Sequence, residues 1–119
     1  MIKPTILVFL AALAAAPAFV WAQRPSGDDA QAGKRFAIMI CAACHVASLD
    51  QPNQPILQPP APDFETIVKQ GSISATSLEK FLTTTLCDIG NPNGMPNPQL
   101  ADYQIIEIVS YLLSLRKQP

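Results

Sequence analysis

The chain has 119 residues, which favours a single domain, and nearly half of them are apolar. Eight basic residues against nine acidic ones give a formal net charge of −1; without the first 22 residues, which include Lys3, seven basic against nine acidic would give −2. This balance excludes a polybasic surface, so no nucleic-acid partner is expected.

Residues 1–22 are interpreted as a signal peptide that directs export. Lys3 provides the positive start, an apolar run follows from Ile6 to Ala16, and the small residue Ala22 ends a cleavage motif. This run is shorter than the about 20 apolar residues that cross a membrane. We therefore expect cleavage and no membrane span afterwards, with an uncleaved N-terminal anchor as the alternative. Residues 23–30 are predicted to be a flexible lead-in.

The folded domain is expected to cover residues 31–119 and to begin with a helix. From Ala30 to Cys44 the apolar residues recur at spacings that place them on one face, and Asp28 or Asp29 could cap this helix. Residues 51–62 then contain so many prolines that they must form an extended loop. This loop is either packed on a cofactor or a disordered linker. The apolar face consists of Phe36, Ala37, Ile40 and Ala43.

Two shorter helices are predicted in the middle of the chain. The first runs from Asp63 to Gln70 and stops at Gly71. The second covers residues 74–86, and residues 88–99 after it are rich in proline, glycine and asparagine, which is typical of a loop. The residues expected to point inward from the second helix are Leu78, Phe81, Leu82 and Leu86.

The last helix has the clearest pattern. Asp102 could cap its start, and Arg116 and Lys117 suit its negative end. No alternating strand pattern appears, so we predict an all-α fold with long loops. The apolar stripe of this helix consists of Ile105, Ile108, Val109, Leu112 and Leu115.

The chemistry of the chain is expected at Cys41-Ala42-Ala43-Cys44-His45. In a C-x-x-C-H motif the two thiols lie one turn apart and can add to the two vinyl groups of a haem, while the adjacent histidine ligates the iron. A domain this small also buries little surface of its own, which a covalent cofactor would offset. We therefore predict one covalently bound haem c, with Cys41 and Cys44 as its attachment points and His45 as an iron ligand.

Other uses of the two cysteines agree less well with the sequence. A thioredoxin-type C-x-x-C needs a βαβ setting, which the pattern does not provide. A zinc site would have to combine Cys41, Cys44, His45 and Cys87, so that two adjacent residues would ligate one ion. A disulfide between Cys41 and Cys44 would leave the histidine without a role.

Met95 is predicted to be the second axial iron ligand by elimination. The sole histidine is already used, and the initiator methionine would leave with the signal peptide. Met39 lies on the helix that leads into the attachment site, where it cannot reach the opposite face of a haem. Met95 instead lies in a loop where Gly94 allows close approach of the backbone and Pro96 stiffens the chain. The alternative role for Met95 is to fill a gap in the core.

In order and spacing, these features resemble the class I cytochrome c family of bacteria over nearly all of the mature sequence. Gly33 lies eight residues before Cys41, where the family has the glycine that lets its N- and C-terminal helices cross closely. A Met-Pro pair leading into a helix with a Tyr-Leu pair resembles the family's ending. The matching residues there are Met95, Pro96, Leu100, Asp102, Ile105, Ile108, Val109, Tyr111 and Leu112.

The sequence departs from the family pattern at three points. Where the family often has an aromatic residue four places after the glycine, this sequence has Ala37, with Phe36 one place earlier. The aromatic partner of Tyr111 therefore stays open. Cys87 has no family role and is either a buried thiol or a site of intermolecular disulfide formation. The proline whose carbonyl would hold His45 is also unassigned, with Pro55, Pro59 and Pro60 as candidates.

The resemblance implies an electron carrier rather than an enzyme. It would reside in the bacterial periplasm and exchange single electrons with redox partner proteins, as a monomer that forms transient complexes. The scattered lysines predict apolar docking with weak electrostatic steering. Two alternatives are an electron-transfer subunit of a larger exported dehydrogenase or oxidase, and a haem sensor or peroxidase in which Met95 is displaced.

Overall fold

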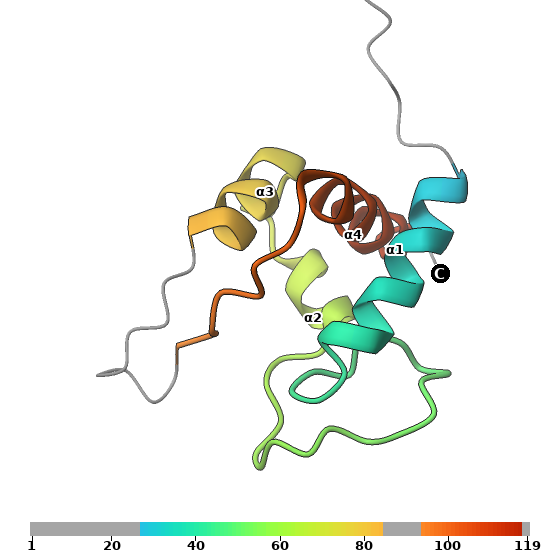
Figure 1. Cartoon of the computed structure of the whole chain (residues 1–119), viewed down its shortest axis with the longest axis vertical. Coiled ribbons are helices and arrows are strands. Elements are labelled where there is room, and N and C mark those ends of the chain that lie inside the picture. Colours follow the sequence, from blue (N-terminus) through green and yellow to red (C-terminus); the bar gives the residue numbers. More distant parts are fainter. Residues whose placement is uncertain (1–26, 85–93, 118–119) are drawn as a thin grey trace, which may run out of the picture.

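The computed structural model describes residues 27–84 and 94–117, and it confirms the predicted all-α fold (Figure 1). The proposed signal peptide and most of the lead-in lie outside these residues. The described part contains no strand, only an isolated bridge between His45 and Ala61. Its helices are α1 (Gly27–Ile40), α2 (Phe64–Lys69), α3 (Ala75–Thr84) and α4 (Asp102–Leu115).

Helix α1 begins at Gly27, earlier than the Ala30 start expected from the sequence, so residues 27–30 are helical rather than part of a flexible lead-in. Asp28 and Asp29 lie in its first turn instead of capping it, and carboxylates there interact favourably with the positive end of the helix. The helix also ends sooner than predicted, at Ile40 rather than Cys44, and gives way to a turn that carries the two cysteines.

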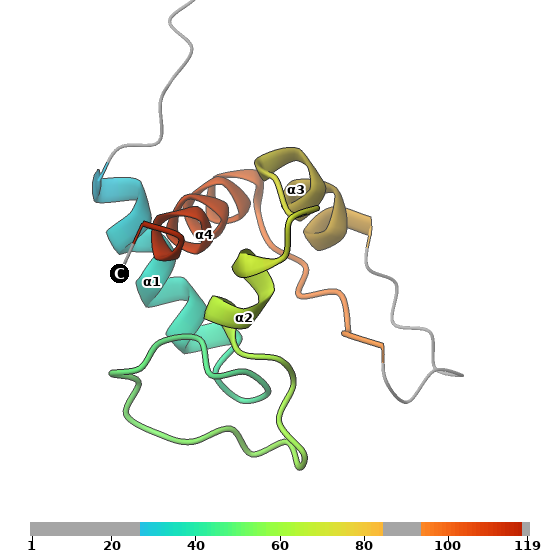
Figure 2. The ribbon, with the colours of Figure 1, turned by 180° about the vertical axis from the view of Figure 1, so that it is seen from behind.

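Helices α1 and α4 pack against each other, as Figures 1 and 2 show from opposite sides, and they approach closely at Gly33. Gly33 is buried, and a Cβ atom added to it would lie 1.8 Å from the backbone oxygen of Glu107 and 2.4 Å from its carbonyl carbon. Backbone therefore contacts backbone at the crossing, and only a residue without a side chain fits. The predicted crossing of the N- and C-terminal helices is confirmed.

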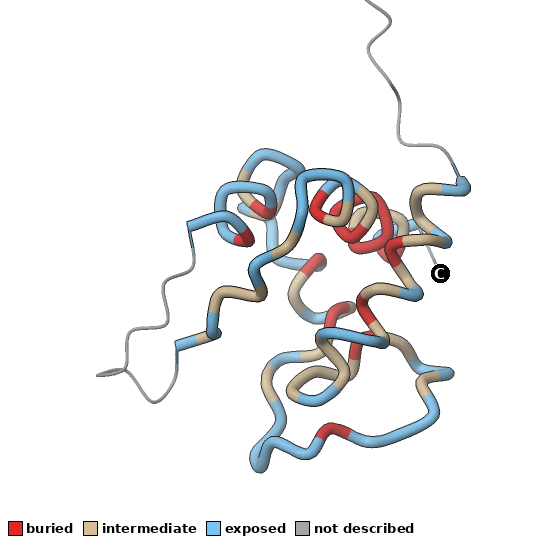
Figure 3. Tube along the Cα trace, viewed as in Figure 1, coloured by how far each residue is buried: buried red, intermediate tan, exposed pale blue. Residues whose placement is uncertain are grey.

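The core lies where α1, α2 and α3 meet α4, the central helix of the fold (Figure 3). All five residues of the predicted α4 stripe are buried. On α3, Leu78 and Leu82 are buried as expected, but Phe81 is 50% exposed, because α3 is short and only its Leu78–Leu82 edge faces the core. The predicted inward position of Phe81 is therefore wrong, and Leu86 lies outside the described residues.

The start of α4 differs from the predicted cap, whereas Arg116 lies at its C-terminal end as expected. The N-cap is Ala101, whose N–H donates to Oε1 of Gln104 at 2.9 Å, and Asp102 is the first helical residue. Arg116 donates from Nε to the carbonyl of Val68 at 2.7 Å and from its guanidinium to the carbonyl of Ile73. Arg116 thus holds the connection between α2 and α3 against the end of α4.

Asp63 caps α2 and fixes where this short helix starts. Its carboxylate accepts from the backbone N–H of Thr66 at 2.7 Å and from the Thr66 hydroxyl at 2.8 Å. These two bonds, the backbone one first, hold the pKa of Asp63 below its ordinary value. The cap is therefore strongest when the carboxyl is ionised.

Asp63→Ala is expected to lower the free energy of unfolding by about 1 kcal/mol at neutral pH, the usual loss for a helix cap. Because the pKa is lower in the folded state, this stabilisation is present above the unfolded-state pKa and is lost as the pH falls through the folded-state pKa. Urea unfolding at several pH values should therefore show that the free energies of unfolding of the wild type and Asp63→Ala become equal in acid. Asp63→Asn, a cap that does not titrate, is the control; a gap between Asp63→Ala and the wild type that stays constant in acid would contradict the prediction.

Candidate functional site

The two cysteines and the histidine lie on one tight turn that continues from α1. The Cys41 N–H donates to the Ala37 carbonyl at 2.8 Å, and the Cys41 carbonyl accepts from the N–H groups of Cys44 at 3.1 Å and His45 at 2.9 Å. Both cysteines are free and partly buried, so the disulfide alternative is not formed. Burial, and then the charge of the neighbouring Cys44, raises the pKa of Cys41 to about 11. The Cys41 thiol is therefore protonated at neutral pH.

The ring of His45 is held by the carbonyl of Pro62, with 2.7 Å between Nδ1 and the oxygen. A carbonyl only accepts hydrogen bonds, so Nδ1 must carry the proton and donate it. The neutral imidazole then has its lone pair on Nε2, which is the nitrogen that remains available to a metal. The turn therefore presents one oriented, neutral nitrogen donor beside two thiols.

The residue that holds His45 is none of the three prolines considered from the sequence, so the candidates Pro55, Pro59 and Pro60 are wrong. The reason is the pairing of the loop with the cysteine turn. Two backbone bonds align the segments, one from the Ala61 N–H to the Cys44 carbonyl at 2.9 Å and one from the Phe64 N–H to the Val46 carbonyl at 3.1 Å. This pairing places Pro62 opposite His45. The sequence signal that could have found Pro62 is its position directly before the Asp63 cap.

Phe64 forms the support behind the histidine. Its ring centroid lies 5.4 Å from that of His45 and 6.5 Å from that of Tyr111, so the three rings form a continuous row. Phe64 is therefore the aromatic partner of Tyr111, which the sequence left open. Phe36 instead contacts Tyr103 edge to face at 6.2 Å, further along the α1–α4 contact.

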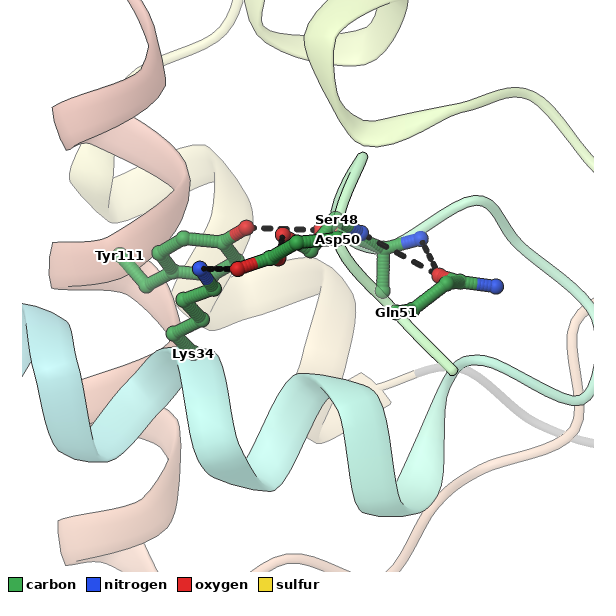
Figure 4. A network of polar contacts seen from close by, with 6 residues as sticks. Lys34, Ser48, Asp50, Gln51 and Tyr111 are labelled. Carbon is green, nitrogen blue, oxygen red and sulfur yellow. Dashed lines mark hydrogen bonds and ion pairs between the residues drawn. The ribbon is translucent and has the colours of Figure 1, made fainter. Parts of the chain in front are cut away.

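The chain just after His45 is fastened by a polar network (Figure 4). The Tyr111 hydroxyl donates to the Ala47 carbonyl at 2.8 Å, and the Ala47 N–H donates to Oε1 of Gln51 at 2.7 Å. Lys34 of α1 forms an ion pair with Asp50 at 2.6 Å, which lowers the pKa of that carboxyl together with a bond from the Ser48 hydroxyl. Helices α1 and α4 thus both hold the loop that follows the histidine.

Tyr111→Phe is expected to lower the free energy of unfolding by about 1–3 kcal/mol, because the Ala47 carbonyl would lose its side-chain donor in a buried position. Ala47 is only 1% exposed, so water cannot easily replace the hydroxyl. Tyr103→Phe is the matched control: Tyr103 is 58% exposed, and its change should stay within about 0.5 kcal/mol. Denaturant unfolding measures both, and equal effects would contradict the assigned bond.

Met95 lies in the extended segment that leads to α4, is partly buried and contacts the core. Met39, the other methionine described, is 76% exposed on α1. Cys87 lies outside the described residues, so the predictions for it stay open. Within residues 27–84 and 94–117, no group of three or more His, Cys, Asp or Glu side chains could hold a metal ion.

The donor set of the turn fits a haem c. Covalent attachment needs two free thiols about one turn apart, and iron needs a histidine whose Nε2 is unprotonated; Cys41, Cys44 and His45 meet both needs. A zinc site would need more ligands than this part of the chain brings together. A thioredoxin-like site would need strands, and the described residues have none.

Comparison with known proteins agrees with this chemistry. Neither the curated proteins nor the solved structures gave a match. None of the described helices is long and apolar enough to cross a membrane. The family model for cytochrome c, however, matches residues 30–116, which include most of α1, the whole of the other three helices and the cysteine turn. The chain therefore belongs to the cytochrome c family, whose members bind haem covalently and transfer electrons through its iron.

Proposed function

We propose that this protein is a carrier of single electrons with one haem, attached through Cys41 and Cys44 and ligated by His45 and Met95. The observation that carries the proposal is the bond between His45 Nδ1 and the Pro62 carbonyl on the same turn as two free thiols. It leaves one nitrogen lone pair directed away from the backbone that holds the ring. Met95 is supported by its partly buried position before α4 and by the exposure of Met39.

When bound, the haem supplies an iron that gains and loses one electron. The residues of the chain keep the ligand set fixed in both oxidation states. Pro62 holds the orientation and tautomer of His45, and Phe64 supports the ring from behind. The bond from Tyr111 to Ala47 fixes the backbone that follows. A histidine whose ring cannot turn keeps the structural rearrangement on electron transfer small.

Export to the bacterial periplasm, and electron exchange with donor and acceptor proteins as a monomer, belong to the same proposal. They are supported by the composition of residues 1–22 and by the family, whose members are typically exported. Two other uses of the haem are outcomes to be tested. Stable co-purification with a partner would indicate a subunit of a larger oxidoreductase. Carbon monoxide binding by the reduced protein would indicate an open sixth position, as a sensor or peroxidase requires.

The experiment that tests covalent attachment is the mass of the exported protein after denaturation and acid–acetone extraction. The proposal expects the mass of the processed chain plus one haem, with the haem retained in the protein. Cys41→Ser combined with Cys44→Ser should give the mass of the chain alone. Haem that is extracted from the wild type, or a mass without haem, would overturn the proposal.

A further inference from the structure

The segment that contains the cysteine turn and the loop after it, residues 36–62, carries almost no charge. From residue 36 to residue 62 the only side chain with a full charge is Asp50, and Lys34 neutralises it at 2.6 Å. The Nδ1 atom of His45 lies 2.7 Å from the Pro62 carbonyl, and its Nε2 is the proposed iron ligand, so neither nitrogen is offered to a partner. Every other charged residue of the described chain lies before residue 36 or after residue 62. The cysteine turn and the loop after it are therefore nearly free of charge themselves.

Five large apolar side chains are exposed in this segment, and two of them, Ile56 and Leu57, are adjacent and bonded to the cysteine turn; the others are Met39, Ile40 and Leu49. Ile56 is 84% exposed and Leu57 is 46% exposed, on the loop that extends beside the end of α1 (Figures 1 and 3). Their backbone N–H groups both donate to the Ala43 carbonyl, at 2.9 and 3.1 Å respectively. Ala43 lies between the two cysteines in the sequence, so the pair is bound directly to the cysteine turn.

The loop that carries this pair is fixed by its own contacts. Pro55 is buried beneath it, and the Gln51 side chain bonds both to the Ala47 N–H and to the Asn53 carbonyl, each at 2.7 Å. The linker alternative considered from the sequence is therefore wrong, because these bonds brace the loop internally and those from Ile56 and Leu57 to Ala43 tie it to the cysteine turn. A contact surface that is already ordered loses little conformational entropy on binding.

We propose that Ile56 and Leu57 form the docking contact for a redox partner whose own docking face is apolar and uncharged. The inference rests on the proposed function, which requires a partner to approach the haem attachment site. A charged partner face would lose hydration against this region without gaining an ion pair. An apolar face would bury both side chains, and it would meet them at the backbone that joins the two attachment cysteines.

Electron self-exchange tests the proposal, with a second copy of the protein in the opposite oxidation state as the apolar probe. The rate is followed by NMR line broadening in mixtures of the oxidised and reduced protein. For the wild type it should be nearly the same at about 0.01 M and about 1 M salt, although the screening length falls from about 30 Å to about 3 Å. Ile56→Lys should slow exchange by about tenfold or more at low salt, with recovery at high salt, because two like charges then meet.

Ile106→Lys is the charge-matched control. Ile106 is 53% exposed on α4, outside residues 36–62. Its substitution by lysine adds the same charge as Ile56→Lys but away from the proposed contact. Its self-exchange rate should stay within about twofold of the wild type. Equal slowing by both variants, or a wild-type rate that depends strongly on salt, would overturn the proposed contact. A stable wild-type dimer that Ile56→Lys dissociates would also overturn it, since a second copy would then cover the pair permanently.

The proposed function is judged separately in the same samples. Covalent haem and a reversible one-electron reduction in Ile56→Lys and Ile106→Lys would show that the carrier function stands, whichever way the exchange rates fall. Loss of haem or of reversible reduction in the wild type would instead overturn the proposed function, and the docking contact with it. Ile56 is largely exposed, so the substitution is not expected to disturb folding.

Discussion

Met95→Ala is expected to abolish the weak far-red absorption band of the oxidised protein and to let the reduced protein bind carbon monoxide. Both changes follow from loss of the thioether that we propose as the second axial ligand. The reduction potential should also fall, by roughly 0.2 V, a fraction of the span of about 0.8 V that axial ligands set. The potential should fall rather than rise because methionine ligation favours the ferrous state, and the variant loses that ligand. Absorption spectra and a potentiometric titration measure all three changes.

Met39→Ala provides the control, because this methionine is 76% exposed on α1 and should affect none of the three measurements. Covalently bound haem should persist in both variants, since the cysteine turn is unchanged. A far-red band that survives in Met95→Ala would contradict the proposed ligation. It would leave Met95 as a gap-filling residue next to the core, the alternative role that its contacts also permit.

Gly33→Ala is expected to lower the free energy of unfolding by about 3 kcal/mol or more, because the new Cβ would overlap the backbone of Glu107. The overlap at 1.8 Å is with backbone oxygen, so no side chain can rotate away and the two helices must move apart. Alanine is the better helix former by about 1 kcal/mol, which offsets only part of this loss. Denaturant unfolding should show a lower midpoint denaturant concentration. The covalent haem stays on the unfolded chain, so its absorption can be used to follow the transition.

Gly71→Ala is the matched control for this substitution. A Cβ at Gly71 would have no atom within 4 Å, and its backbone does not have a positive φ. The same chemical change there should alter the free energy of unfolding by no more than about 0.5 kcal/mol, or raise it slightly. If the two variants unfold alike, the close crossing of α1 and α4 does not exist in solution.

The sequence was sufficient to predict those parts of the fold that depend on local periodicity. The α4 stripe was predictable because residues such as Ile108 and Leu112 recur at helical spacing over four turns. The cap of α4 was not, because Gln104 reaches back to Ala101 and leaves Asp102 inside the helix. A choice between adjacent residues depends on a single side-chain bond, which periodicity does not encode.

The site shows the same division between local and long-range information. The turn with Cys41, Cys44 and His45 could be predicted because its chemistry lies within five adjacent residues. The support for His45 could not, because five prolines follow within seventeen residues and only the pairing of residues 61–64 with 44–46 selects Pro62. The aromatic row through Phe64 to Tyr111 likewise joins residues far apart in the chain.

The measurement that tests the central claim most directly is a potentiometric titration of the exported protein, followed by absorption spectroscopy. A carrier with one haem ligated by His45 and Met95 should show a single reversible one-electron transition at positive potential, with the far-red band present only in the oxidised form. It should not bind carbon monoxide when reduced. Absence of the band together with carbon monoxide binding, or more than one transition, would contradict a single haem held by these two ligands.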